Sequence, residues 1–403
     1  MRRRTKKRLL IFTIFIIIVG LVSITSYKFW KNNNKKPVDV KEPVIEKPVK
    51  PKEPQVDKLS FLATGDALIH SGIYEFYRQK DGSYDFTNSL ALVKDIVPKY
   101  DIAYYNQETV FGGKEFGYSN FPMFNTPSEF GDAMLNIGFN TVSIASNHSF
   151  DKGEKGALNN IKYFKEKNVL YNGMAENETD RTTYIIKEKN NIKYSMLSYT
   201  MSTNGLNTPK GKEYLVNVYD KEKARKDIEA LKKEVDVLMV AMHWGNEYAS
   251  MPNNTQKEVA QFLADLGVNI IIGSHPHVLQ PITWIGDTLV IYSLGNFISN
   301  QYTTDNYNKK VGLFATLDIT KTTTEAGSTI KLSNLGGELL FSYYKKNSGN
   351  LPNTAHQVIP FSKMTDDTYL KDYPKYYDMY SKIIKAYTTE INIAPLQQKT
   401  SVN

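Results

Sequence analysis

The chain of 403 residues contains no cysteine. This absence excludes disulfide bonds, thiolate metal ligands and lipid modification at a cysteine. A metal ion bound to this protein must therefore use oxygen and nitrogen ligands. Histidine is also scarce, with six in the whole chain, so the positions of the histidines are informative.

The part of the chain after residue 57, which is expected to fold, also lacks a strong net charge. Its net charge of +8 comes from residues 1–57, which hold 14 Lys or Arg and 5 Asp or Glu, whereas the remainder holds 36 and 37. A nearly neutral remainder provides no field that attracts a polyanion, and nothing in it favours binding to nucleic acid. The basic excess near the N-terminus instead indicates membrane topology.

One long apolar run follows the basic start MRRRTKKR. It spans Leu9–Thr25, which fits a membrane span of roughly 20 residues better than the shorter apolar core of a signal peptide. No small-x-small cleavage site stands out, so an uncleaved anchor is favoured over a removed signal peptide. We expect residues 1–30 to form a cytoplasmic basic flank and one transmembrane signal-anchor helix, near residues 9–27. The protein would then lie in the cell membrane as a single-pass protein, with its main domain extracellular.

Composition divides the rest of the chain. Residues 31–57 are rich in Pro, Lys, Val and Glu, which predicts a semi-rigid linker without a core. We expect the main domain over residues 58–300. Residues 301–390 are expected to add strands and a Tyr-rich helix that complete this domain or are appended to it. The last residues, 391–403, are expected to be a disordered tail.

Short apolar runs alternate with helical stretches, which predicts an α/β fold with a parallel sheet. The expected strands are Leu59–Gly65, Ile102–Tyr105, Thr141–Ser146, Val237–Met242 and Ile270–Gly273. The expected helices are Phe86–Lys99, Ser128–Ile137, Lys155–Lys167, Lys221–Glu234 and Thr255–Leu266. Two expected hairpins interrupt the alternation and suggest a second sheet packed on the first: 183–187 with 194–199, and 282–285 with 289–293.

Each of these five strands is followed at once by carboxylate, amide or imidazole groups. They are Asp66, then Asn106 and Glu108, then Asn147 and His148, then His243, then His275 and His277, with His70 four residues after Asp66. Ligands of such sheets bind outside the carboxyl ends of the strands, so we expect these groups at one edge. Carboxylates and neutral imidazoles bind zinc, manganese and iron. The leading hypothesis is therefore a metal centre with one or two divalent ions, whose identity stays open.

These polar clusters differ in how strongly each one indicates a functional site. The pair His275 and His277 is the strongest, because Pro276 between them makes a rigid turn behind a glycine. Asp66 alone is also typical of a plain turn, and the Asn106/Glu108 pair alone is equally typical of a solvated loop. Taken jointly they favour a metal centre, since two ions about 4 Å apart activate water and hold a phosphoryl group from both sides.

The order of these segments resembles the calcineurin-like metallophosphoesterase superfamily, and more closely its CapA/PgsA family of poly-γ-glutamate capsule synthesis. The matching segments lie within residues 58–300 and are ATGD ending at Asp66, YNQE at 105–108, IASNH ending at His148, MHWGNEY at 242–248, GSHPHVLQ at 273–280 and YSLGNF at 292–297. The resemblance implies a four-layer α/β/β/α sandwich of metallophosphoesterase type. An N-terminal signal-anchor fits the same family.

The resemblance also implies metal ligands. One half of a two-metal site would be formed by Asn147, His243 and His275, with Glu108 or Asn106 as the bridge. The other half keeps only Asp66 and His277, together with that bridge.

The sequence departs from the superfamily in that second half. Leu68 stands where the superfamily has a histidine, and His70 is a candidate replacement although its spacing differs from the motif. His148 corresponds to the residue that protonates the leaving group in the hydrolases. Trp244 and Asn296, which lie in matching segments, are candidate accessory residues.

Two functions remain open, and with them whether the protein is an enzyme. The first is a membrane-anchored extracytoplasmic component of poly-γ-glutamate capsule biosynthesis or export, with polymer-synthase membrane subunits and the anionic polymer as partners. The second is an extracytoplasmic metal-dependent phosphoesterase that acts on a phosphate ester of the cell envelope. The missing histidine at position 68 weakens the second, and the neutral charge mildly weakens direct binding of the polymer.

Overall fold

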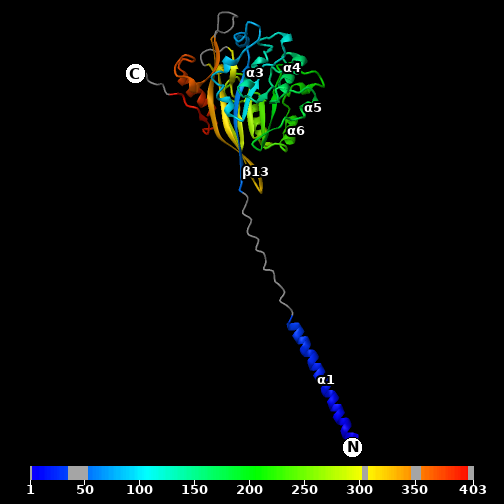
Figure 1. Cartoon of the computed structure of the whole chain (residues 1–403). Coiled ribbons are helices and arrows are strands. Elements are labelled where there is room, and N and C mark those ends of the chain that lie inside the picture. The colour runs from blue at the N-terminus through cyan, green and yellow to red at the C-terminus, as the bar shows by residue number, and fades with distance from the viewer. Residues whose placement is uncertain (1, 35–52, 302–306, 346–354, 398–403) are drawn as a thin grey trace, which may run out of the picture. The chain divides into compact units, whose positions relative to one another are not determined.

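The computed structural model describes residues 2–34, 53–301, 307–345 and 355–397 (Figure 1). The chain forms two compact units, residues 1–52 and residues 53–403, and each is described by itself. Of the expected linker, residues 35–52 lie outside the described residues, residues 31–33 belong to the first helix and residues 55–57 belong to the first strand.

The N-terminal unit is one helix, α1 (Arg2–Asn33), which extends beyond the expected span of 9–27 at both ends. Within its segment Thr5–Asn33, an 18-residue window reaches a mean hydropathy of 2.7, so length and composition allow it to cross a bilayer, as they would for a signal sequence. The hydroxyls of Thr13, Ser23 and Thr25 donate to carbonyls four residues earlier at 2.7–3.0 Å. The polar side chains inside the apolar run are therefore satisfied within the helix, as an apolar surrounding requires.

The larger unit contains two mixed sheets. The first has nine strands, in the order β14-β13-β12-β1-β2-β3-β4, with β11 paired to β1 and β15 paired to β13. Strands β1 to β4 are mutually parallel, whereas β12, β13 and β14 are antiparallel. The strands are β1 (Gln55–Leu68), β2 (Ile102–Gln107), β3 (Thr141–Ser143), β4 (Leu170–Asn172), β11 (Asn296–Ser299), β12 (Val311–Thr324), β13 (Gly327–Lys345), β14 (Ala355–Pro360) and β15 (Asn392–Ile393).

The second sheet has six strands in the order β5-β6-β7-β8-β10-β9. Its four central strands are parallel, and each edge strand is antiparallel to its neighbour as part of a hairpin. The strands are β5 (Lys187–Lys189), β6 (Ile192–Thr200), β7 (Val237–His243), β8 (Ile270–Ser274), β9 (Ile282–Ile285) and β10 (Thr288–Ile291).

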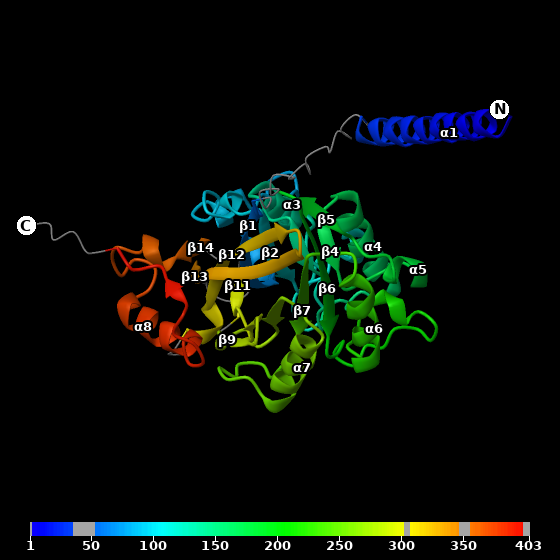
Figure 2. The same cartoon turned by 90° about the horizontal axis from the view of Figure 1, so that it is seen from below.

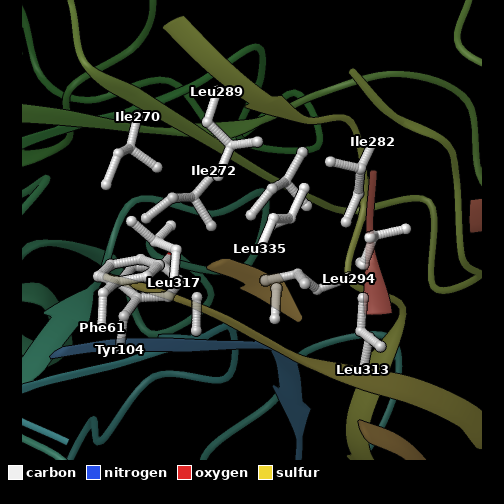
Figure 3. Close-up of a cluster of buried hydrophobic side chains, with 14 of the residues drawn as sticks. Phe61, Tyr104, Ile270, Ile272, Ile282, Leu289, Leu294, Leu313, Leu317 and Leu335 are labelled. Atoms are coloured by element: carbon white, nitrogen blue, oxygen red, sulfur yellow. The ribbon is translucent and has the colours of Figure 1, made fainter. Parts of the chain in front are cut away.

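The two sheets pack face to face. Figure 3 shows Ile270, Ile272 and Leu289 of the second sheet facing Phe61, Tyr104 and Leu317 of the first, all of them buried. Side chains alternate along β1, so Phe61 points between the sheets while Leu62 belongs to the core on the other face. The apolar layer between the sheets is thus continuous.

Helices cover the two outer faces. The helices α3 (Glu129–Asn136) and α4 (Gly153–Glu166) pack on the first sheet, and α6 (Lys221–Leu231) and α7 (Asn254–Asp265) pack on the second (Figure 2). The predicted four-layer α/β/β/α sandwich is therefore confirmed. The remaining helices are α2 (Ser71–Tyr74), α5 (Glu178–Arg181), α8 (Tyr373–Ile384) and the 3₁₀ turns η1 (Thr87–Leu90), η2 (Val97–Lys99), η3 (Lys114–Phe116), η4 (Glu213–Leu215), η5 (Asn308–Lys310) and η6 (Phe361–Lys363).

Three local predictions are wrong. The expected helix over 86–99 is two short 3₁₀ helices, η1 and η2, joined by turns, and Pro98 within η2 cannot donate a backbone hydrogen bond. Strand β3 ends at Ser143 and not at 146, and the chain continues in a loop from residue 144. The first strand of the hairpin is Lys187–Lys189 and not 183–187, so it lies directly beside the Asn190-Asn191 turn.

The C-terminal part belongs to the same core. Tyr373, Tyr380 and Ile384 of α8 are buried and belong to the same apolar cluster as the residues between the sheets. The tail expected to be disordered over 391–403 contains β15, which pairs in parallel with β13, and Ile391 is buried. Residues 398–403 of that tail lie outside the described residues.

Candidate metal centre

The parallel strands of both sheets end at a common set of polar side chains. In the first sheet, Asp66 stands opposite Asn106 of β2 and Asn296 of β11. In the second sheet, His243 ends β7 opposite Ser274 of β8. Backbone pairing therefore fixes the register of neighbouring strands, and this register brings the side chains at the strand ends to the same edge of the sheet.

Three overlapping groups of donor atoms lie at this edge, and within each group the atoms are within 4.8 Å of one another. The groups are Asp66–Glu108–His277, Glu108–His243–His275 and Glu247–His275–His277. Each pair of groups shares one residue, so the six residues form a single compact cluster. Three carboxylates and three imidazoles at this spacing are suited to one or more divalent cations.

Glu108 stands at the centre of the cluster. Its Oε1 lies 3.8 Å from Nε2 of His243 and 3.5 Å from Nε2 of His277. Both carboxylate oxygens are buried without a hydrogen-bond partner. Burial raises the pKa of Glu108 well above its usual range, although His277 opposes this. Glu108 belongs to two of the three donor groups, those with Asp66 and with His243.

The side chains of Asn106 and Asp66 contact each other. Nδ2 of Asn106 donates to Oδ1 of Asp66 at 2.9 Å, while Oδ1 of Asn106 is buried without a partner. Oδ2 of Asp66 accepts from the backbone N–H of His275 at 3.2 Å and lies 3.3 Å from Nδ1 of His277. The pair thus connects the ends of β1 and β2 to the turn after β8.

His243 faces the other half of the cluster. Its Nε2 lies 2.9 Å from Oδ1 of Asn147, and its Nδ1 lies 3.0 Å from Oγ of Ser274. Burial lowers the pKa of His243 well below its usual range, and the neighbouring imidazoles act in the same direction. A metal-bound histidine is a neutral imidazole whose second nitrogen is usually held by a hydrogen bond, and here the hydroxyl of Ser274 is in position to hold it.

The His-Pro-His turn holds its two histidines with positive φ values, 92° at His275 and 58° at His277. Non-glycine residues seldom adopt this conformation, and it clusters at functional sites. Burial lowers the pKa of His275 to about 4. At His277 burial also disfavours the charge, but Glu108 and Asp66 outweigh it and raise the pKa to about 9. Oδ1 of Asn296 lies 3.1 Å from Nδ1 of His277 and orients that ring.

His148 lies beside the cluster but in none of the three donor groups. Its Nδ1 is 2.7 Å from Oδ2 of Asp151, which also accepts from the backbone N–H of Phe124. The Phe124 ring meets the imidazole edge to face at 4.7 Å. These contacts fix the orientation of a mostly buried imidazole.

Two accessory candidates lie away from the cluster. Nδ1 of His70 contacts the carbonyl of Leu68 at 3.0 Å, and the residue is in none of the three donor groups. Trp244 points into the core between the second sheet and its helices, where Nε1 donates to the carbonyl of Tyr292 at 2.9 Å. It holds β7 in place and does not reach the metal centre.

Sequence reasoning missed Glu247 and Asp151. Glu247 stands four residues after His243 in the segment MHWGNEY, and Asp151 stands three residues after His148. Both acidic residues can be read in the sequence close to a histidine. Only the fold shows that their carboxylates turn toward the histidines.

Several buried polar atoms in the cluster lack a hydrogen-bond partner, which indicates whether a metal ion fits here. Both oxygens of Glu108, Oδ1 of Asn106 and Nδ1 of His275 have no hydrogen-bond partner among the described residues. Burying such groups without a partner costs free energy, and a cation offsets that cost. The absence of thiolates and the mixture of oxygen and nitrogen donors suit manganese, iron or zinc.

Comparison with known proteins finds matches to the part of the chain that carries this cluster. Residues 60–301 match the family model described as "Bacterial capsule synthesis protein PGA_cap". The "Capsule biosynthesis protein CapA" of Bacillus anthracis is 32% identical over 178 residues, 42% of this chain and 42% of that protein. The "PGA biosynthesis protein CapA" of Bacillus subtilis (strain 168) is 32% identical over 170 residues, 42% of this chain and 44% of that protein. Each match thus spans less than half of its relative.

Solved structures are also similar. The "calcineurin-like phosphoesterase YfkN from Bacillus subtilis" aligns with a TM-score of 0.41 and 16% identity, over 69% of this chain and 90% of that chain.

Proposed function

The chain belongs to the PGA_cap family of bacterial capsule synthesis proteins, and from this we propose that it acts in the synthesis or export of a poly-γ-glutamate capsule. The helix α1 holds it in the cell membrane, with the basic N-terminus in the cytoplasm and residues 53–403 outside. Polymer-synthase membrane subunits and the anionic polymer are its proposed partners.

The buried donor cluster is the observation that carries the biochemical part of this proposal. Asn147, Glu108, His243 and His275 would hold one divalent ion, and Asp66, Glu108 and His277 a second. Bound ions supply Lewis-acid polarisation of a carbonyl or phosphoryl oxygen and lower the pKa of water. The chain itself orients the ligands through Ser274, Asn296 and the backbone of His275.

Lys309 supports an anionic substrate. Its Nζ lies 4.1 Å from the centre of the Tyr248 ring, and that ring is 6.1 Å from the ring of His277. No carboxylate among the described residues forms an ion pair with Lys309. An ammonium group at the edge of the centre can receive a carboxylate or a phosphate, although the domain as a whole is nearly neutral.

A second candidate function, hydrolysis of a phosphate ester in the cell envelope, is supported by the pair His148 and Asp151. Asp151 holds Nδ1 of the imidazole, which leaves Nε2 to donate a proton to a leaving oxygen. The same arrangement would serve a cleavage step on the polymer, so the substrate distinguishes the two functions.

One experiment tests the first function. The gene is replaced in a producing strain by the parent, by His275→Ala and by Glu258→Gln, an exposed acid on α7 that serves as the control. We expect the cell-bound polymer to fall sharply with His275→Ala at equal protein level and to stay at the parent level with Glu258→Gln. Polymer at the parent level in a strain that lacks the gene would contradict the proposal.

Protease added to protoplasts of the same strains tests the topology. We expect the large unit to be released from the membrane. A protected domain, or a mature protein that begins beyond residue 30, would contradict the anchor.

A further inference from the structure

We propose that Glu247 is a metal ligand of this centre and that it closes the centre on the side that faces solvent. The inference rests on the metal site proposed above and adds to it a carboxylate that the family pattern in the sequence does not identify. The ligand class is a divalent cation that accepts oxygen and nitrogen donors together, such as manganese, iron or zinc.

The first observation is the position of the carboxylate. An oxygen of Glu247 and a nitrogen of each of His275 and His277 lie within 4.8 Å of one another. His275 also belongs to the group around His243, and His277 belongs to the group around Asp66. Glu247 therefore lies next to two histidines, each of which also belongs to one of the other two donor groups.

The second observation is that the loop carrying Glu247 is fastened to the turn that carries those histidines. The backbone N–H of Tyr248 donates to the carbonyl of Pro276 at 2.8 Å, and that of Trp244 donates to Ser274 at 3.1 Å. On the far side, Nε2 of Gln280 donates to the carbonyl of Ala249 at 2.8 Å. The carboxylate thus approaches the histidines from a loop held on both sides.

The turn that brings Glu247 back depends on Gly245. This residue has a φ of +88°, and a Cβ there would lie 2.6 Å from Oε1 of Gln256. Gln256 is fixed in turn, because it forms the capping box of α7 with Asn253 and donates to Gln280. Backbone geometry, and not the side chain alone, therefore directs the loop toward the centre.

The third observation is an incomplete ligand set at the second ion position. Asp66, Glu108 and His277 supply three donors, and position 68 contributes only the buried apolar side chain of Leu68. A divalent ion such as zinc takes at least four ligands, so three donors leave a coordination position toward solvent that a further side chain can fill. Glu247 is exposed, unlike Asp66 and Glu108, so it can complete this position without the desolvation cost of a third buried carboxylate.

Binding of Mn²⁺ and Zn²⁺ to the full chain in detergent tests the inference, by calorimetry and by metal content after gel filtration. The variants are Glu247→Gln, which removes the charge, Glu247→Asp, which keeps the charge but withdraws the carboxylate, and Glu258→Gln as the control. We expect Glu247→Gln to weaken binding of the ion at Asp66, Glu108 and His277 by about 10-fold or more, since even indirect ligand contacts contribute that much. Glu247→Asp should fall between this variant and the parent, and Glu258→Gln should match the parent.

The outcomes separate the two proposals. If the parent binds ions and Glu247→Gln binds both of them equally well, the role of Glu247 is refuted while the metal site stands. If Glu258→Gln weakens binding as much as Glu247→Gln, or if Glu247→Asp matches the parent, Glu247 acts through charge alone and is not a ligand. A parent chain that binds no ion refutes the metal site itself. Because Glu247 is exposed, the metal-free variants should keep the parent's melting temperature.

Discussion

Oε1 of Glu108 lies 3.5 Å from Nε2 of His277, and both side chains are almost completely buried. The same oxygen lies 3.8 Å from His243. Glu108 is thus the carboxylate that connects the ends of the two sheets, since Glu108 follows β2 of the first sheet, whereas His243 ends β7 and His277 follows β8 of the second. A group in that position determines whether the two ion positions can be filled together.

Replacing Glu108 by Gln should remove more than half of the stabilisation that metal gives to the domain. A ligand at 100 times its dissociation constant stabilises a folded protein by about 2.7 kcal/mol. We expect this gain in the parent and less than half of it in Glu108→Gln, because both ion positions lose their shared ligand. Melting curves with and without Mn²⁺ measure it, and Glu338→Gln, a largely buried acid remote from the centre, is the matched control. An undiminished gain in Glu108→Gln would show that Glu108 is not the bridge.

His243→Ala should remove the tighter of the two ions. The group around His243 has four donors when Oδ1 of Asn147 is included, whereas the group around Asp66 has three before any contribution from Glu247. Titration with Mn²⁺ should show a tight and a weak site in the parent and only the weak one in the variant. His70→Ala is the control, because His70 lies outside the donor groups. Loss of the tight site in His70→Ala as well would mean that the variants act on the fold and not on the ligand set.

Lys309→Met should weaken binding of anionic substrates without changing metal content. A hydrogen bond to a charged group contributes about 1.5–3 kcal/mol, which corresponds to a loss of about 10-fold or more in affinity. Binding of short γ-linked glutamate chains, measured at two salt concentrations, is the readout, and Lys226→Met on the exposed face of α6 is the control. Equal losses in the two variants would place the anion elsewhere.

The general rule for α/β sheets predicts most of this centre, because strand register is set by the backbone. Once β1 and β2 pair in parallel with Asp66 opposite Asn106, the groups that follow both strands lie together whatever the intervening chain does. The same holds for His243 and the turn after β8. These positions depend on apolar periodicity, which a single sequence displays.

The segment MHWGNEY shows where such reasoning ends. Trp244 is one residue from His243 and points to the opposite face of the sheet, whereas Glu247 is four residues away and returns to the centre through the turn at Gly245. The turn is fixed by contacts with Pro276 and Gln280, which are distant in sequence. The helix expected over 86–99 is wrong for a related reason, since tertiary packing and Pro98 override its apolar spacing.

Substitution of His148 distinguishes the two functions, because this residue transfers a proton only if the protein cleaves a bond. A positioned imidazole contributes about 10²–10⁴-fold to proton transfer. If the domain hydrolyses a phosphodiester, His148→Ala should lose that factor while Mn²⁺ content stays at the parent level, because the neighbouring Asn147 and not His148 contacts the donor groups.

The partner of His148 provides the control for this loss. Asp151→Asn keeps the size of the side chain that lies 2.7 Å from Nδ1 of His148 but removes its charge. If His148 transfers a proton, Asp151→Asn should lower the rate by a smaller factor and shift its pH profile. If His148 only packs against Phe124, Asp151→Asn should leave the profile in place.

Polymer yield in the same variants decides between the functions. A scaffold that holds a metal should keep its polymer output in His148→Ala and lose it in His275→Ala, since only His275 belongs to the donor groups. Loss of polymer in His148→Ala at full metal content would show instead that proton transfer at this centre is part of capsule synthesis. A phosphodiesterase rate that His148→Ala leaves unchanged would rule out the hydrolytic role of this residue.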